Sequence, residues 1–431
     1  MNAVVVALGK IGLPIAAQLT RTGHSVTGCD IDPAVVEAVN AGRAPFPNEA
    51  GLDDALRDAV GGGRLRATAD TAAAIAAGPE LVIAVPPLVV NDEGTPDWSA
   101  LDAVVRDIGT GLAAAAQTGH RGITVAIETT VPVGTTRTRI APALATISGL
   151  RAGIDFHVVF SPERVFSGRI LQDLATYPKL VGGLDPAGEQ RGVALYGSFL
   201  PDVEVRAMGG AEAAELTKLA ETTYRDINIA FANELARHAD GLGIDVQRVI
   251  DAANSQPFSH IHRPGVAVGG HCIPVYPRFY LAGDPGAQLP AVARHVNEAM
   301  PAYAVGVLQD LLGGLEGKRV LILGVAYRGG VKETAFSGAV PLRDNLRARG
   351  AVAVASDPLY APDELRALGF EPWDGVPVHG AVIQADHAEY ARLQPEDLAG
   401  VRAIVDGRGV LDATPFTAAG VPVRRLGGGA A

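Results

Sequence analysis

The chain has 431 residues, of which 48% are hydrophobic, so it can bury more than one core and we expect two or three domains. Its 36 Lys and Arg against 47 Asp and Glu give a formal net charge of −11, which argues against a nucleic-acid partner. Two cysteines, no apolar stretch near the roughly 20 residues of a membrane helix and no basic leader together predict a cytoplasmic protein without a membrane partner.

The first segment alternates strand patterns with helical ones. We predict strands over residues 2–8, 25–30, 81–85, 122–127 and 157–160, with a helix over 11–22 and Ala-rich helical stretches between the later strands. Such alternation is typical of parallel βαβ units with helices on both faces of the sheet. Residues 1–200 are therefore predicted to form a Rossmann-like domain.

The middle of the chain is helical, with predicted helices over 211–241, 244–253 and 290–312. In the first of these, apolar residues recur at spacings of three or four. They are Leu216, Leu219, Ala220, Tyr224, Ile227, Phe231 and Leu235. A long apolar stripe must be buried against something, so residues 201–312 are predicted to be an all-helical connector or oligomerisation domain.

Strand patterns return over 319–323, 352–356 and 401–405, and they predict a second Rossmann-like domain over residues 313–431. The Gly/Ala-rich end after Leu426 is predicted to be a loose tail. The predicted fold class is therefore α/β, with two doubly wound domains joined by a central all-helical domain.

The turn after the first strand has the spacing of a dinucleotide site. Gly9 and Gly12 are small enough for a pyrophosphate to approach the backbone at the start of the helix. Asp30, ending the second predicted strand, is the expected acceptor for a ribose hydroxyl and favours NAD over NADP, because it would repel a 2′-phosphate. Ala7 stands where a first glycine is usual. The alternative is an ordinary tight turn.

Cys272 lies in the segment Pro-Gly-Val-Ala-Val-Gly-Gly-His-Cys-Ile-Pro, residues 264–274. Gly269 and Gly270 would allow a substrate close to the backbone and leave N–H groups free for an oxyanion. A thiolate can attack an aldehyde, and the resulting thiohemiacetal can lose hydride to NAD to form a thioester. The alternative is a buried, inert cysteine, which is the prediction for Cys29. No His, Cys and Asp cluster has metal-ligand spacing, so no metal is expected.

Further motifs follow in order along nearly the whole chain. They are Gly9-x-x-Gly12-Leu13-Pro14, Val85-Pro86, Thr130-Val131-Pro132-x-Gly134-Thr135, Ser161-Pro162-Glu163-Arg164-Val165, Glu215-Leu216-x-Lys218-Leu219, Asn228-Ile229-Ala230, Asn233-Glu234 and Gly269-Gly270-His271-Cys272-Ile273-Pro274. Together they resemble the UDP-glucose/UDP-mannose dehydrogenase family of nucleotide-sugar 6-dehydrogenases. The Gly-Gly-His-Cys-Ile form resembles the branch that acts on UDP-N-acetylhexosamines.

The resemblance implies a role for each matching position. It implies a Cys272 nucleophile with Thr130 beside the reacting carbon, Glu163 as general base towards water and Lys218 as the group that stabilises an oxyanion. The implied cofactor contacts are Gly9, Ile11, Gly12, Asp30, Val85, Pro86, Thr130 and Arg328. The implied substrate contacts are Glu163, Lys218, Gly269, Gly270, Tyr276, Arg328 and Lys332. Arg328 and Lys332 would hold the nucleotide diphosphate, with solvated surface charge as the alternative.

The resemblance also implies a UDP-sugar substrate, a homodimer and a product used in polysaccharide biosynthesis. The predicted function is a two-step oxidation of a UDP-N-acetylhexosamine to the uronic acid with NAD. The alternatives are a UDP-glucose 6-dehydrogenase, a two-electron dehydrogenase of the 6-phosphogluconate type and a catalytically impaired nucleotide-sugar-binding paralogue.

Three positions depart from the pattern. Tyr276 stands where the family commonly has Asp, Thr222 where it has Asn, and Phe258 where a substrate-binding Arg is expected. Three explanations are open. The second oxidation could use Glu163 as its only acid–base group, Tyr276 could take over a hydrogen-bonding role, or the chain could bind an unusual sugar.

Overall fold

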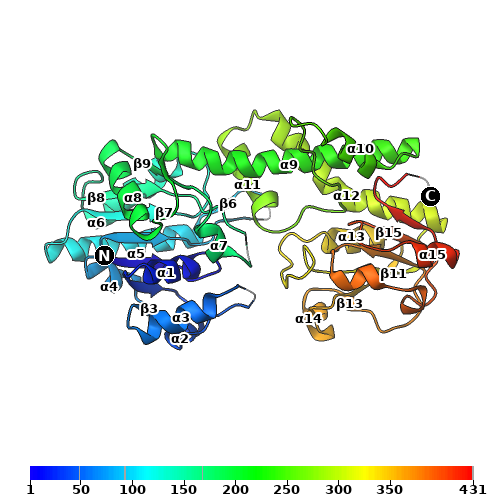
Figure 1. The fold of residues 1–431 in the computed structure, drawn as a ribbon, viewed down its shortest axis with the longest axis horizontal. Helices are drawn as coiled ribbons and strands as arrows, with labels where there is room; N and C mark the ends of the chain where they lie inside the picture. Colours follow the sequence, from blue (N-terminus) through cyan, green and yellow to red (C-terminus); the bar gives the residue numbers. More distant parts are fainter. Residues whose placement is uncertain (48, 92–93, 167, 430–431) are drawn as a thin grey trace. The chain divides into compact units, whose positions relative to one another are not determined.

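A computed structural model of the chain describes residues 1–47, 49–91, 94–166 and 168–429 (Figure 1). The chain forms two compact units, Met1–Glu221 and Thr222–Ala431. Each unit is built around its own β-sheet. The division into three domains at residues 200 and 312 remains a prediction. None of the described helices is long and apolar enough to cross a membrane.

The first unit contains an eight-stranded sheet in the order β10-β9-β8-β7-β4-β1-β2-β3. Its strands are β1 (Asn2–Val6), β2 (Ser25–Cys29), β3 (Leu65–Thr68), β4 (Leu81–Ala84), β7 (Ile123–Ile127), β8 (Phe156–Phe160), β9 (Lys179–Gly183) and β10 (Val205–Ala207). Strands β1, β2, β3, β4, β7 and β8 are parallel, whereas β9 runs antiparallel to β8. The carboxyl ends of the parallel strands and the beginning of β9 therefore meet at one edge. Two short strands, β5 (Val89–Val90) and β6 (Pro96–Asp97), pair separately.

The helices of the first unit cover this sheet. They are α1 (Gly12–Arg21), α2 (Pro33–Asn40), α3 (Leu52–Gly61), α4 (Thr71–Ala76), α5 (Ser99–Gln117), the π-helix η1 (Thr136–Ile140), α6 (Ala141–Ser148), α7 (Ile170–Leu174) and α8 (Pro186–Phe199). Leu13, Leu56, Leu171 and Tyr196 bring α1, α3, α7 and α8 into one buried core with the strands. Helix α4 packs on β1 and β2 and against α5, which in turn packs against α6.

The second unit contains a six-stranded sheet in the order β13-β12-β11-β14-β15-β16, and all its strands are parallel. The strands are β11 (Arg319–Leu323), β12 (Val352–Ser356), β13 (Glu371–Pro372), β14 (Gly380–Ile383), β15 (Ile404–Asp406) and β16 (Val423–Arg425). Helices α12 (Gln288–Leu312) and α13 (Ala339–Ala348) pack on one face of this sheet. On the other face, Phe416 of α15 (Thr414–Ala418) and Tyr390 of the 3-10 helix η2 (Ala388–Arg392) join the strands in a second core. The remaining short helices are α14 (Pro362–Ala367) and η3 (Pro395–Asp397).

The long helix α9 (Ala211–Leu242) buries mainly small and polar residues, and of its predicted apolar stripe it buries Leu219 fully and Ile227 and Leu235 in part. Ala232, Ala236 and Ala239 pack against α10 (Val246–Ala253), and the helix α11 (Cys272–Gly283) follows further along the chain. Tyr224, Phe231 and Leu242, by contrast, are 57%, 49% and 58% exposed. They recur after seven and eleven residues, which places them on one face of a helix with 3.6 residues per turn. This α9 apolar face, Tyr224, Phe231 and Leu242, is left without cover in the single chain.

The α/β class with a helical middle is confirmed, and most predicted strands lie within two residues of their predicted bounds. The loose tail after Leu426 is wrong for the described residues. The Gly427 amide donates to Asp240 Oδ2 over 3.0 Å, and the Gly427 carbonyl accepts from the Val246 amide over 2.7 Å. A glycine is required there because a Cβ atom at Gly427 would lie 2.5 Å from the Val246 side chain. The small residues therefore allow close packing rather than looseness.

The turn between β1 and α1 depends on one glycine and one strained alanine. A Cβ atom at Gly12 would lie 2.0 Å from the Ala7 carbonyl oxygen, so only glycine fits there. Ala7 itself has a φ of 72°, a left-handed conformation that costs a residue with a side chain about 1–2 kcal/mol. Where a glycine is usual, this chain therefore keeps the glycine conformation and accepts the strain.

Gly12→Ala is expected to lower the free energy of unfolding of the ligand-free protein by about 1–3 kcal/mol, because the turn must move to admit the methyl group. Thermal unfolding of the variant measures this. Gly9→Ala is the matched control, since a Cβ atom there meets nothing within 4 Å. Equal melting temperatures for the two variants would contradict the packing argument.

Candidate active site

The predicted site residues of the first unit lie at one edge of its sheet. Gly9 follows β1, Asp30 follows β2, Pro86 follows β4, Thr130 follows β7 and Glu163 follows β8. Strand order reverses between β1 and β4, with β2 and β3 on one side and β7 and β8 on the other. Doubly wound sheets bind ligands at the carboxyl ends of the strands beside such a reversal.

The residues after β1 and β2 fit a dinucleotide. Helix α1 begins after Ile11 with no side-chain cap, so its first N–H groups can face phosphate oxygens. The space beside Gly9 is open. The Asp30 carboxylate is oriented by two amides, since Oδ2 accepts from Leu8 over 2.8 Å and Oδ1 from Asp32 over 3.0 Å. A carboxylate at the end of β2 suits a ribose hydroxyl.

A buried ion-pair network lies at the same edge, directly after β7, in the loop after β8 and at the start of β9. Lys179 Nζ donates to Glu128 Oε2 over 2.7 Å and to Glu163 Oε2 over 2.9 Å. Tyr196 of α8 donates its hydroxyl to Glu128 Oε1 over 2.5 Å. The second Glu163 oxygen, Oε1, accepts from the Arg164 amide over 2.6 Å. The predicted base is therefore hydrogen-bonded at both carboxylate oxygens.

The two carboxyl groups of this network differ in proton affinity. Burial raises the pKa of Glu128 to about 7, although Lys179 acts to lower it. Burial acts in the same direction on Glu163, but Lys179, the Arg164 amide and Lys218 outweigh it and lower the pKa of Glu163 below its usual value. At neutral pH Glu163 is therefore ionised, whereas Glu128 is partly protonated.

Helix α9 ties two of the edge loops together. Glu215 accepts from the Gly134 amide over 2.6 Å and from the Thr136 amide over 2.9 Å, which pins the loop that carries Thr130. One turn later Lys218 Nζ donates to the Glu163 carbonyl oxygen over 2.5 Å. Lys218 and Glu163 are therefore brought together, through the backbone of Glu163.

The Thr130 loop also contacts the loop after β4. Thr129 Oγ1 donates to the Pro86 carbonyl oxygen over 2.5 Å, and the Val85 amide donates to Val6 of β1 over 3.0 Å. Thr130 itself is buried, with 5% of its surface exposed. The predicted residues on these two loops, Val85, Pro86 and Thr130, thus belong to one hydrogen-bonded edge.

In the second unit Cys272 is the first residue of α11, and its thiol is free and exposed. The helix has no side-chain cap, and uncapped N–H groups at a helix N-terminus favour negative charge nearby. One turn along, the ring of Tyr276 meets His271 edge-on at 5.7 Å and lies 5.8 Å from Phe279. An aromatic ring therefore occupies the position where the family commonly has a carboxylate.

The glycines before the thiol serve packing. A Cβ atom at Gly269 would lie 2.6 Å from Tyr327 Cβ, and one at Gly270 would lie 3.0 Å from the Tyr327 ring. The Gly270 amide donates to the Ala335 carbonyl oxygen over 2.9 Å. The expectation that both glycines leave N–H groups free for an oxyanion is therefore wrong for Gly270.

The segment that leads to the thiol is held by asparagines of α9. Asn233 Oδ1 accepts from the Gly265 amide over 2.9 Å. Asn228 Oδ1 accepts from the His262 amide over 2.9 Å, and its Nδ2 donates to the His260 carbonyl oxygen over 2.6 Å. The Val266 amide then donates to the Gly407 carbonyl oxygen over 3.0 Å. The thiol segment therefore runs along the carboxyl edge of the second sheet.

The predicted diphosphate contacts lie on the loop after β11. Lys332 Nζ donates to Glu364 Oε1 over 2.6 Å, and the Arg328 guanidinium lies 5.7 Å from the centre of the Tyr327 ring. Sequence reasoning missed Arg408, which follows β15 at the same edge and donates to the Gln384 and Tyr327 carbonyl oxygens over 2.6 and 3.1 Å. The signal available for it was Asp-Gly-Arg-Gly directly after a predicted strand.

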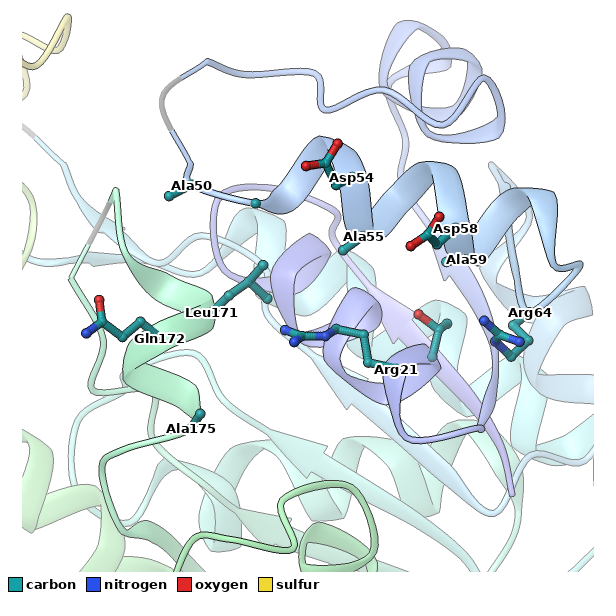
Figure 2. Close-up of a pocket in the computed structure, with 12 residues that line it drawn as sticks. Arg21, Ala50, Asp54, Ala55, Asp58, Ala59, Arg64, Leu171, Gln172 and Ala175 are labelled. Carbon is teal, nitrogen blue, oxygen red and sulfur yellow. The ribbon is translucent and has the colours of Figure 1, made fainter.

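A cavity of about 650 Å³ lies elsewhere in the first unit (Figure 2). It is lined by the end of α1, by α3 and by α7, with Arg21 reaching toward Leu171 (Figure 2). Arg21 ends α1 and Arg64 directly precedes β3, so both mark the amino edge of the sheet. Neither Asp30 nor Glu163 lines this cavity.

Comparisons with known proteins match three consecutive parts of the chain. Residues 1–200 match the UDP-glucose/GDP-mannose dehydrogenase family, NAD binding domain; residues 212–299 match its central domain; and residues 321–413 match its UDP binding domain. A UDP-N-acetyl-D-mannosamine dehydrogenase of Pyrococcus horikoshii is 34% identical over 428 residues, covering 96% of this chain and 97% of the relative. An NDP-N-acetyl-D-galactosaminuronic acid dehydrogenase of Ralstonia nicotianae is 31% identical, with coverages of 96% and 97%.

Solved structures are similar over the same length. The UDP-D-ManNAc dehydrogenase of Pyrococcus horikoshii has a TM-score of 0.87 and 31% identity, covering 99% of each chain. A UDP-glucose dehydrogenase of Pyrobaculum islandicum also has a TM-score of 0.87, with 28% identity, and covers 100% of this chain and 98% of its own.

One of the two thiols is expected to react rapidly with a disulfide reagent such as DTNB in the native protein. Cys272 is exposed, whereas Cys29 is buried, and burial raises the pKa of Cys29 to about 11, so it holds little reactive thiolate. Cys272→Ser should abolish the rapid reaction, and Cys29→Ser should leave it. Rapid labelling that persists in Cys272→Ser would contradict this placement.

Proposed function

Because the chain belongs to the UDP-glucose/GDP-mannose dehydrogenase family, whose NAD-dependent chemistry it shares, we propose that it oxidises the C6 alcohol of a UDP-N-acetylhexosamine to the carboxylate. The observation that carries the proposal is the exposed Cys272 thiol at the uncapped start of α11. Two relatives named for N-acetylated sugars support the substrate class. The product would be a uronic acid for polysaccharide biosynthesis.

NAD, when bound, accepts one hydride in each of the two oxidations. The residues that fit its pyrophosphate and ribose are Gly9, Ile11, Gly12 and Asp30, with Val85, Pro86, Thr130 and Arg328 as further proposed contacts. The substrate diphosphate is assigned to Arg328 and Lys332, and the sugar to the segment of Gly269, Gly270 and Tyr276. These assignments follow the matching motifs and the edges on which the residues lie.

In the proposed reaction the alcohol first loses its hydroxyl proton and a hydride to become an aldehyde. The Cys272 thiolate then adds to the aldehyde carbon, and Lys218 stabilises the negative oxygen until it takes up a proton. Loss of the second hydride to NAD and of the hydroxyl proton to solvent leaves a thioester. Glu163 removes one proton from water, whose oxygen attacks the carbonyl carbon, and the C–S bond breaks to release the thiolate and the acid, which loses its remaining proton to solvent as the carboxylate.

Cys272→Ser is expected to abolish formation of the acid, because the thioester cannot form. Wild-type protein should produce two NADH per sugar when UDP-glucose, UDP-N-acetylglucosamine and UDP-N-acetylmannosamine are screened, with the highest turnover on an N-acetylated sugar. Product analysis measures the acid, and NADH formation measures the stoichiometry and the turnover. Cys29→Ser is the control and should keep acid formation and two NADH per sugar.

Other outcomes of this screen identify the alternatives. Unchanged turnover in Cys272→Ser with one NADH per sugar would indicate a two-electron dehydrogenase. Calorimetric binding of the UDP-sugars without any NADH would indicate an impaired sugar-binding paralogue, and a preference for UDP-glucose would overturn the N-acetylhexosamine assignment.

We also propose a homodimer in the cytoplasm. The α9 apolar face, Tyr224, Phe231 and Leu242, would be buried against a second copy of the chain, since a row of large apolar side chains on one helix is costly to leave in water. The cytoplasm would supply NAD and keep Cys272 reduced.

Phe231→Glu is expected to weaken the dimer, because a carboxylate would lose its hydration in the interface. Sedimentation velocity at micromolar concentration should give a dimer for the wild type and a larger monomer fraction for the variant. Ile154→Glu is the matched control, since Ile154 is also an exposed apolar residue, 63% exposed, but lies outside α9. A monomeric wild type would refute the proposal.

A further inference from the structure

We propose that Lys179 is the positioning residue of the Glu163 carboxylate, and that Glu128 takes up the one proton that the buried network favours, so that Glu163 stays ionised and can accept a proton from water. This inference deepens the proposed function and rests on the general-base role assigned there to Glu163. It gives a role to three buried residues that the proposed reaction does not otherwise use, namely Lys179, Glu128 and Tyr196.

The direction of β9 is what brings the cation to the site. Val159 of β8 pairs with Gly183 of the antiparallel β9, and Phe160 pairs with Gly182. Continued by three residues, this register sets Lys179 across from Glu163. A parallel strand would begin at the amino edge of its neighbours, so its first residue could not reach the carboxyl edge.

The network is buried except at Glu163. The side chains of Lys179, Glu128 and Glu163 are 6%, 0% and 9% exposed. Each carboxylate lies within 2.9 Å of the same ammonium, which also lies 5.2 Å from the centre of the Tyr196 ring. Glu163 is the member that reaches the surface of the edge, and it is the one placed to meet a ligand.

Charge counting explains why Glu163 is the ionised member. One ammonium between two carboxylates leaves one negative charge in excess, and an uncompensated buried charge is costly, so the network favours uptake of one proton. Glu163 has the Arg164 amide at its second oxygen and Lys218 nearby, whereas Glu128 has a neutral tyrosine. The proton therefore resides on Glu128.

The charged and titratable groups around Glu163 come from every element packed against it. They are Glu128 after β7, Arg164 in its own loop, Lys179 of β9, Tyr196 of α8, and Lys218 and Glu221 of α9, of which Glu221 pairs with Arg164. Arg164 and Glu221 offset each other, and the Tyr196 hydroxyl stays neutral because burial holds the pKa of Tyr196 well above its usual value. Lys179 and Glu128 are thus the groups that determine whether Glu163 is protonated.

Two substitutions are expected to affect the acidic limb of the pH–kcat profile differently. Lys179→Met leaves two carboxyl groups sharing a buried site without their cation, so Glu163 holds its proton to higher pH and the limb moves up by about 1–3 pH units. Glu128→Gln keeps the shape and the neutral state of the protonated Glu128, so the limb stays in place. A purely structural role would lower the stability of both variants without moving the limb in Lys179→Met alone.

The experiment measures kcat between about pH 4 and pH 9, a range that reaches the ordinary pKa of a glutamate, at saturating NAD and the UDP-sugar of the screened panel that gives the highest turnover. The expected result is an upward limb shift in Lys179→Met, no shift in Glu128→Gln and little change in KM for NAD. Lys179→Arg, which keeps the cation, should return the limb toward the wild-type position. Equal shifts in Lys179→Met and Glu128→Gln, or no shift in Lys179→Met, would overturn the inference.

Two further variants keep the test decisive. If Lys179→Met does not fold, Lys179→Met with Glu128→Gln removes the cation while residue 128 stays neutral, and its limb should lie above that of Glu128→Gln alone. Glu163→Gln separates the two proposals. If it abolishes turnover while the limbs stay in place, only the role of Lys179 fails. If it retains wild-type turnover, the general-base assignment fails and this inference with it.

Discussion

The site edge of the first unit depends on the buried ammonium of Lys179. It joins the end of β7, the loop after β8 and the start of β9 through Glu128 and Glu163. A buried ion pair adds little net stability, but removing one partner leaves an unpaired charge and costs about 3–5 kcal/mol. The loops at this edge are therefore held together by ion pairs to one ammonium. Helix α9 adds hydrogen bonds to the same loops from Glu215 and Lys218.

The second unit holds its thiol segment by a different means, a chain of neutral and charged hydrogen bonds between α9 and α12. Arg294 donates to Asp226, and Asn297 donates to the same carboxylate over 2.8 Å. Asn233 then donates to Asn297 over 2.8 Å and accepts from the Gly265 amide. Buried polar networks whose groups find partners are rigid. The start of the segment that ends in Cys272 is thus tied to the helix pair.

The departures from the family pattern change the chemistry available around the thiol. The Tyr276 ring packs against His271 and Phe279, and Phe258 is 94% exposed where a cationic side chain is expected. Neither aromatic residue can supply a carboxylate or a guanidinium. In the proposed reaction Glu163 is therefore the acid–base group. The contacts of Lys179 with Glu163 and Glu128 matter because they keep Glu163 ionised.

The sequence by itself determined the local features. Apolar runs predicted β11 and β12 to the residue, because burial requires apolar side chains along a strand. The Gly9–Gly12 spacing predicted the turn before α1, because the close approach of the Ala7 carbonyl admits only glycine at residue 12. Short strands such as β9 and β14 were missed, and α11 was not predicted around Cys272. Only the tertiary structure decided two sets of contacts, those of Lys179 with two glutamates and those of Arg408 with two carbonyl oxygens. These contacts depend on the order of the strands and on the reversed direction of β9, and no local sequence pattern specifies either.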